Sequence, residues 1–145
     1  MAADDFVDDI NAGTYGKGQQ VIYEMNVGSY TSEGTFAAAE QRLDELKRTG
    51  VDIVWLMPIY PRGGGINSPY AAVDFKAVNP DYGTVDDLKS FVSAAHGKGI
   101  KVWLDWVPNH TATDAKWVSS HPEYYKTVNG QMVHPNNYGD VYQLN

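Results

Sequence analysis

Between positions 21 and 107, short apolar runs alternate with longer segments of helical periodicity. Three runs, at 21–27 (VIYEMNV), 51–57 (VDIVWLM) and 100–107 (IKVWLDWV), are rich in β-branched and aromatic residues, which is typical of strands. The middle run is almost continuously apolar, as expected of a strand that is covered on both faces. The pattern therefore predicts three strands.

Two amphipathic helices are predicted between these strands. The first has an apolar face with a helical period and ends at Gly50, which we expect to adopt a left-handed conformation; that face comprises Phe36, Ala39, Leu43 and Leu46. The second begins at Thr84, with Asp87 as its capping-box partner, and ends at Gly97. The order strand, helix, strand, helix, strand predicts two consecutive βαβ crossovers, and hence an α/β fold with a parallel sheet.

The remaining segments divide the chain into three parts. Residues 1–20 are polar, acidic and Gly-rich, and we interpret them as a lead-in to the domain at 21–110. Residues 111–145 show no sustained period. Because a structureless loop of that length is uncommon in a compact domain, we expect either a loop excursion or the start of an inserted small domain.

Charge and composition exclude several classes of protein. The chain has 145 residues, with 18 acidic against 11 basic residues and a net charge of −7. It has no Lys/Arg cluster, so we do not expect a nucleic-acid partner. No apolar run approaches the roughly 18 residues of a membrane span. The absence of cysteine excludes a disulfide scaffold and a thiol nucleophile. The start lacks the pattern of a signal peptide, which leaves a cytoplasmic or an extracellular location open.

Candidate site residues follow the predicted strands, because ligands of parallel α/β sheets bind at the carboxyl ends of the strands. The block DWVPNH places Asp105 and His110 on either side of the end of the third strand. A carboxylate in so apolar a stretch needs a partner. Two interpretations stay open: the pair belongs to a site, or Asp105 ties down a loop and His110 is an ordinary surface imidazole.

The loop after the second strand carries a second candidate, Tyr70 in GGGINSPY. An aromatic ring on a long rim loop can stack against the apolar face of a sugar. Alternatively, the ring fixes the loop to the domain. The glycines at 63–65 do not indicate a phosphate-binding loop, because neither a Lys-Ser/Thr pair nor a helix follows them directly.

Several of these segments together resemble a known family. VIYEMNVGSYTSEGTF, VDIVWLMPIYP and SPYAAVDFKAVNPDYGTVDDLKSFVSAAHGKGIKVWLDWVPNHTA resemble, in order and spacing, the opening third of the catalytic barrel of the α-amylase family, glycoside hydrolase family 13. The tail HPEYYKTVNGQMVHPNNYGDVYQLN resembles the start of the protruding B domain. The resemblance implies the first three βα units of a TIM (β/α)8 barrel, incomplete here, from the SPY-type subgroup that acts on starch, maltodextrin or pullulan.

The resemblance also implies roles for individual residues. His110 would donate or accept a hydrogen bond with the sugar that precedes the scissile bond, Tyr70 would stack beneath that sugar, and Asp105 would organise the site. Asn67 stands where some relatives have a substrate-binding aspartate. Asn109 matches a position that often ligates a structural calcium ion, although the aspartate-rich calcium loop of other members is missing after the first strand.

Catalysis in this family is retaining, with an aspartate nucleophile and a glutamate acid/base on the fourth and fifth strands. No catalytic residue is therefore expected in this segment. We expect it to be the N-terminal part of a glycosidase that acts on α-glucans, contributing substrate-binding residues but inactive alone. The alternatives are a catalytically inactive α-amylase-like domain used for binding or assembly, and an unrelated nucleotide-binding α/β domain. The latter lacks a glycine fingerprint after the first strand.

Overall fold

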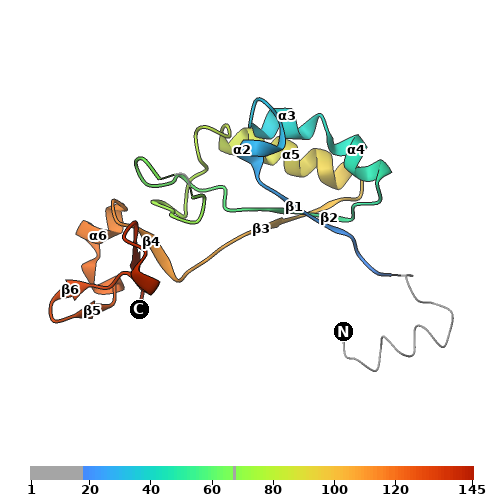
Figure 1. Ribbon diagram of the computed structural model, residues 1–145. Coiled ribbons are helices and arrows are strands. Elements are labelled where there is room, and N and C mark those ends of the chain that lie inside the picture. Colours follow the sequence, from blue (N-terminus) through green and yellow to red (C-terminus); the bar gives the residue numbers. More distant parts are fainter. Residues whose placement is uncertain (1–17, 67) are drawn as a thin grey trace, which may run out of the picture.

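The computed structural model describes residues 18–66 and 68–145, and its centre is a three-stranded sheet (Figure 1). The strands β1 (Ile22–Met25), β2 (Ile53–Leu56) and β3 (Lys101–Leu104) lie in the order β1-β2-β3. Both neighbouring pairs are parallel. The predicted parallel α/β sheet is therefore confirmed, with each strand shorter than the apolar run that predicted it.

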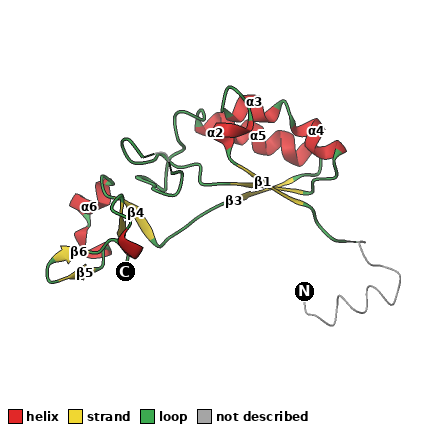
Figure 2. Cartoon of the chain, in the orientation of Figure 1, coloured by secondary structure: helices red, strands yellow, loops and turns green. Residues whose placement is uncertain are grey.

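The register of the sheet brings the carboxyl ends of the strands to one edge. Leu56 at the end of β2 pairs with Met25 on one side and with Leu104 on the other. The loops that follow the strands therefore begin next to one another, although they are far apart in the sequence. This edge faces the long loops and the tail in Figure 2.

Three helices cover one face of the sheet: α3 (Phe36–Glu40), α4 (Leu43–Arg48) and α5 (Val85–Gly97), as Figure 1 shows. Their apolar faces and β2 form the main core, whose fully buried side chains include Phe36, Leu43, Val54, Leu56 and Phe91. Each such side chain contributes about 1.5–3 kcal/mol when removed from water. β2 is covered as predicted, since Ile53, Val54 and Leu56 are all buried.

The ends of the helices agree with the sequence analysis, but the first helix is interrupted. Thr84 and Asp87 form the predicted capping box, with the Asp87 amide donating to Thr84 Oγ1 at 3.1 Å and the Thr84 amide to Asp87 Oδ2 at 2.7 Å. Gly50 has a φ of 87° and ends α4 in the expected left-handed conformation. The single predicted helix over 36–48 is instead two helices, because the backbone at Arg42 (φ −98°, ψ 0°) leaves the helical region.

A further short helix, α2 (Val27–Tyr30), follows β1 directly and was not predicted. Its first turn is capped by Asn26, whose Oδ1 accepts a hydrogen bond from the Gly28 amide at 3.1 Å. Four residues are too few for an apolar period to show in the sequence. The expected strand at 21–27 therefore ends two residues earlier than its pattern suggested.

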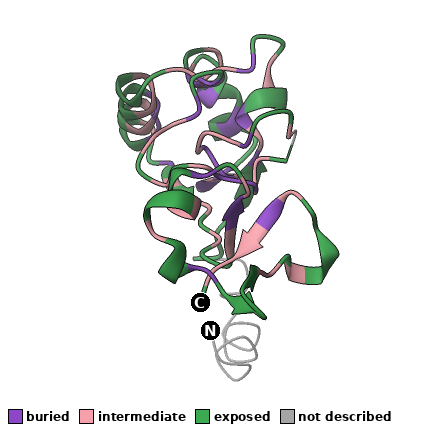
Figure 3. Cartoon of the chain, turned by 90° about the vertical axis from the view of Figure 1, so that its left-hand side faces the viewer, coloured by how far each residue is buried: buried purple, intermediate pink, exposed green. Residues whose placement is uncertain are grey.

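Residues 110–145 form a second, smaller body beyond the sheet edge (Figures 1 and 2). Strand β4 (His110–Ala112) pairs antiparallel with β7 (Val141–Gln143), and β5 (Thr127–Val128) pairs with β6 (Gln131–Met132). Three short helical elements complete it: α6 (Lys116–Ser120), η1 (Pro122–Tyr124) and η2 (Pro135–Asn137). Most of this body is exposed or half-buried, with buried residues in β4 (Figure 3).

A small second core joins this body to the loop that follows β2. Ala71, Ala112 and Val141 are buried together in it. The Ala112 amide donates to the Ala72 carbonyl at 2.8 Å, and the Gly64 amide donates to Asp114 Oδ2 at 2.8 Å. The second loop and the tail are thus held against each other. No helix of the described residues is long and apolar enough to cross a membrane.

Candidate functional site

Tyr70 and Asp105 meet at the carboxyl edge of the sheet. Asp105 follows β3 directly, and its amide continues the parallel pairing by donating to the Leu56 carbonyl at 3.0 Å. The Tyr70 hydroxyl donates to Asp105 Oδ2 at 3.0 Å. Both residues are half-buried. The carboxylate therefore has the partner that its position in an apolar stretch required.

His110 is held at the same place by two contacts. Its Nε2 lies 3.1 Å from the Tyr70 carbonyl oxygen, and its Nδ1 lies 3.0 Å from the side-chain nitrogen of Asn109. A neutral imidazole with its proton on Nε2 satisfies both contacts, because Nε2 then donates to the carbonyl and Nδ1 accepts from the amide. The structure thus brings Tyr70, Asp105 and His110 together. These contacts are compatible with a sugar-binding site and also with Asp105 and His110 only holding their loops in place, so the sugar-binding roles stay predictions.

The Tyr70 hydroxyl is a neutral hydrogen-bond donor over a wide pH range. Burial, which is the largest cause, and the hydrogen bond to the Asp105 carboxylate together raise the pKa of Tyr70 to about 12. Burial also raises the pKa of Tyr60, and the charge of Asp105 contributes there as well. Tyr70 and Tyr60, the two phenols whose pKa the Asp105 charge helps to raise, therefore both stay protonated at neutral pH.

A pocket of about 280 Å³ opens beside Tyr70 and His110. One side is formed by the loop after β2 and by the start of β4, and the other by the segment between η2 and β7. The lining residues are Ser68, Tyr70, Ala71, His110, Tyr138, Asp140 and Val141. Tyr138 and Asp140 had not been predicted as site residues. Only the long-range pairing of β4 with β7 brings them here, and no local pattern in the tail signals it.

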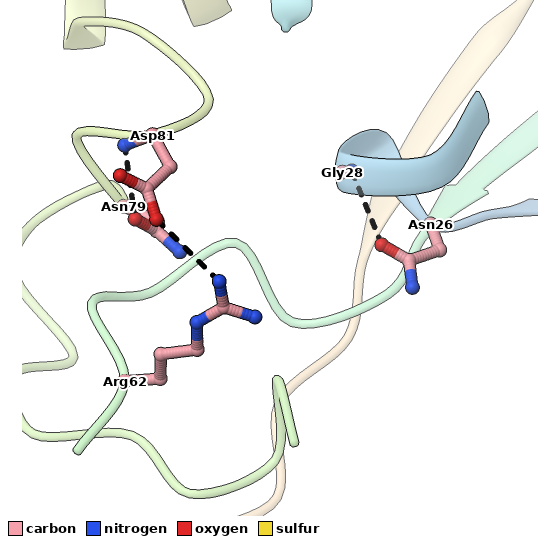
Figure 4. Close-up of polar contacts among 5 residues, drawn as sticks. All are labelled: Asn26, Gly28, Arg62, Asn79 and Asp81. Carbon is pink, nitrogen blue, oxygen red and sulfur yellow. Dashed lines mark hydrogen bonds and ion pairs between the residues drawn. The ribbon is translucent and has the colours of Figure 1, made fainter. Parts of the chain in front are cut away.

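A second, more polar pocket of about 250 Å³ lies on the other loops of this edge, around Asn26, Arg62 and Asp81. Arg62 Nη2 and Asp81 Oδ2 are 3.4 Å apart, and the Asp81 amide donates to Asn79 Oδ1 at 3.0 Å (Figure 4). In the same view the side-chain oxygen of Asn26 accepts a hydrogen bond from the amide of Gly28, two residues further along the chain. These contacts are local to the loops after β1 and β2, so they stabilise the loop that carries Tyr70.

The other two predicted positions are Asn67 and Asn109. Asn67 lies outside the described residues. Asn109 is exposed, and its amide nitrogen contacts His110. Calcium prefers about six to eight oxygen ligands, and within the described part of the chain no three His, Cys, Asp or Glu side chains gather around a common point. Calcium at Asn109 stays a prediction.

Known proteins resemble the chain over most of its length. The family model "Alpha amylase, catalytic domain" matches residues 3–144. An alpha-glucosidase from Apis mellifera is 34% identical over 139 residues, covering 84% of this chain and 24% of that protein. A trehalose-6-phosphate hydrolase from Bacillus subtilis is 43% identical over 102 residues, covering 67% of this chain and 18% of that protein. The chain thus spans less than a quarter of the length of these curated relatives.

Solved structures show the same relationship. An alpha-amylase from Lactobacillus plantarum matches with a TM-score of 0.81 and 39% identity, over 86% of this chain and 31% of that one. A noncanonic maltogenic alpha-amylase from Thermotoga neapolitana matches with a TM-score of 0.77 and 36% identity, over 87% of this chain and 32% of that one. Sequence and fold together show that the chain belongs to the α-amylase catalytic-domain family of glycosidases, glycoside hydrolase family 13.

Proposed function

We propose that this chain is the N-terminal, sugar-binding part of a retaining glycosidase that acts on α-glucans such as starch, maltodextrin or pullulan. The observation that carries the proposal is the cluster of Tyr70, Asp105 and His110 beside a pocket at the carboxyl edge of a parallel sheet. Ligands of such sheets bind at this edge. The names of the relatives, an alpha-glucosidase and a trehalose-6-phosphate hydrolase among them, support a substrate built from glucose units.

In this proposal β1, β2 and β3 with their helices are the first three βα units of a (β/α)8 barrel, and residues 111–145 begin its B domain. The parallel order of the strands and the position of all three covering helices on one face support this arrangement. A complete barrel needs about 250 residues. The curated relatives are more than four times longer than the part that this chain matches in them.

The contacts of the three residues indicate the role of each in sugar binding. The Tyr70 ring forms a wall of the pocket, and the hydrogen bond to Asp105 fixes its orientation, so the ring is presented to a sugar in one position. His110 lines the same pocket and is held by the Tyr70 carbonyl through Nε2. Its Nδ1 can exchange the contact with the exposed Asn109 side chain for a hydrogen bond with a sugar hydroxyl. Asp105 acts through Tyr70 as a positioning residue.

The proposal assigns the two catalytic carboxyl groups to residues outside these 145. A retaining glycosidase needs a nucleophile and an acid/base whose carboxyl groups are roughly 5–5.5 Å apart. Asp105 is engaged by the Tyr70 hydroxyl, which supports a role in holding the site rather than in attacking the sugar. The 145-residue segment alone is therefore expected to be inactive.

The test is hydrolysis of maltotriose by the full-length protein, followed by proton NMR of the anomer that forms first. The retaining mechanism predicts that the new reducing end is initially α, the configuration of the bond that was cleaved. A β product would contradict the retaining mechanism. Binding of maltotriose without any cleavage would instead support the alternative of a catalytically inactive α-amylase-like domain. Neither binding nor cleavage of any α-glucan would overturn the proposed substrate class.

A further inference from the structure

The geometry points to Tyr138 as the second aromatic wall of the sugar pocket and a residue that determines how tightly a glucosyl unit is held. This inference rests on the proposed function and extends it to the tail of the chain. Tyr138 lines the pocket of about 280 Å³ together with Tyr70 and His110. It comes from the segment between η2 and β7, whereas Tyr70 comes from the loop after β2.

The backbone around Tyr138 is fixed relative to His110. Strand β7 pairs with β4, so that Gln143 lies opposite His110. Ahead of β7, the Thr113 amide donates to the Asp140 carbonyl at 3.1 Å, and Nδ1 of His134 lies 2.8 Å from the Val141 carbonyl. The residues that follow Tyr138 are therefore held to β4 and to Thr113 just after it, and His134, which precedes Tyr138, is held to β7.

The second core fixes the opposite wall. Ala71, directly after Tyr70, is buried against Ala112 and Val141. The Ala112 amide also donates to the Ala72 carbonyl at 2.8 Å. Since this packing joins the loop of Tyr70 to the strands next to Tyr138, the two walls belong to one packed unit.

The side chain of Tyr138 is available to a ligand. It is 63% exposed, and within the described part of the chain it makes no side-chain hydrogen bond and no ring contact. The ring of the nearby Tyr142, in contrast, packs against both Tyr125 and His134. Two consecutive residues with positive φ, Asn136 at 50° and Asn137 at 62°, turn the chain just before Tyr138.

The chemistry of the pocket fits one face of a glucosyl unit. A pyranose ring has an apolar face of C–H groups, and a flat aromatic ring buries such a face effectively. Its hydroxyl groups lie around the edge of the ring. Asp140 also lines the pocket, and a carboxylate can accept hydrogen bonds from such hydroxyl groups. Tyr138 then contributes to the binding of the sugar in the ground state, so its removal changes KM more than kcat.

The experiment compares Tyr138→Ala and Tyr138→Phe in the full-length protein, with maltotriose as substrate. Tyr138→Ala is expected to raise KM about fivefold to tenfold, the loss of one aromatic contact, and to leave kcat nearly unchanged. Tyr138→Phe keeps the ring and should keep the KM of the parent. The Tm of Tyr138→Ala should also equal that of the parent, because the side chain is 63% exposed.

A matched control is Tyr124→Ala, because Tyr124 is also an exposed tyrosine of the tail, 43% exposed, but lies outside the pocket. Its KM should equal that of the parent. An unchanged KM for Tyr138→Ala in an active parent overturns this inference and leaves the proposed function intact. A Tyr138→Phe variant as impaired as Tyr138→Ala overturns the stacking role. A parent that neither binds nor cleaves α-glucans removes the proposed function itself.

Discussion

The Tyr70 hydroxyl and the Asp105 carboxylate are joined by a hydrogen bond of 3.0 Å across 35 positions of sequence. The carbonyl of the same tyrosine accepts the contact from His110 Nε2 at 3.1 Å. Tyr70 therefore connects the loop after β2 to residues on both sides of the segment that leads from β3 to β4. A change at any of the three residues is expected to alter the pocket that Tyr70 and His110 line.

The phenol of Tyr70 is expected to titrate later than an ordinary tyrosine. Its pKa of about 12 lies above the ordinary value of 10.0, first because of burial and then because of the Asp105 carboxylate. Asp105→Asn should lower this pKa, because the negative charge beside the phenolate is lost. The near-ultraviolet absorbance of phenolate, followed against pH, measures the change. The difference from Tyr70→Phe identifies the signal of Tyr70.

The raised pKa of Tyr70 also makes the free energy of unfolding depend on pH. A phenol whose pKa is higher in the folded than in the unfolded chain stabilises the fold below a pH of about 10, and this contribution is lost as the pH rises toward about 12. The parent should therefore lose more of its free energy of unfolding over this range than Tyr70→Phe does. Equal losses would show that burial of Tyr70 has no effect on its titration.

The predicted sugar contact of His110 can be tested by kinetics. In the full-length protein, His110→Ala should lower kcat/KM by an amount equivalent to roughly 1–3 kcal/mol, the range for the loss of a hydrogen bond to substrate. The control is His96→Ala, since His96 is an exposed histidine on α5. Equal kcat/KM values in both variants would instead support the interpretation of His110 as an imidazole that only ties down its loop.

The glycines of the second loop offer a matched pair for testing how the tail is attached. A Cβ at Gly63 would lie 2.6 Å from Ile66 Cδ1 and 2.9 Å from Ala112 Cβ, whereas one at Gly64 would meet only Asp114 Oδ2 at 3.4 Å. Gly63→Ala is therefore expected to destabilise the fold by about 1–3 kcal/mol through overpacking. Gly64→Ala should change the free energy of unfolding much less, and denaturant titration compares the two.

Isolated residues 1–145 are expected to self-associate. In the described structure, β1 and β3 each pair on one side only, and Ile22, Trp103 and Leu104 are 46%, 47% and 51% exposed. Unpaired apolar edge strands are sites of intermolecular pairing. Light scattering should show particles whose size grows with protein concentration. Trp103→Lys should reduce this size more than Val128→Lys, which lies on the distant hairpin of β5 and β6. A monomer that melts cooperatively would contradict this expectation.

The parts of the fold that local pattern specifies were predicted well. The apolar run of β2, the capping box of Thr84 and Asp87 and the left-handed Gly50 each depend on residues close in sequence. The break at Arg42 escaped prediction, because its apolar neighbours keep the helical period across it. The parallel order of the strands followed from the alternation of elements, and with it the position of Asp105 at the sheet edge.

The tail could not be predicted in the same way. Its strands β4 and β7 have three residues each, too few for an alternating pattern, and they pair across about thirty positions. Tyr138 enters the pocket only through that pairing. His110 and Tyr70 were found because they follow predicted strands and because their motifs resemble those of a known family. No comparable signal marks Tyr138 in the sequence.

The pairing of β4 with β7 also affects how the chain tolerates changes in length. The stretch between these strands starts and ends at hydrogen-bonded neighbours, since Ala112 lies opposite Val141. At its far tip, Asn129 and Gly130 have φ values of 51° and 76° and form the turn between β5 and β6. Extra residues at this tip lengthen a loop whose ends are already joined, and the entropy of such a loop grows slowly with its length. Insertions at this tip are therefore expected to leave His110 in place.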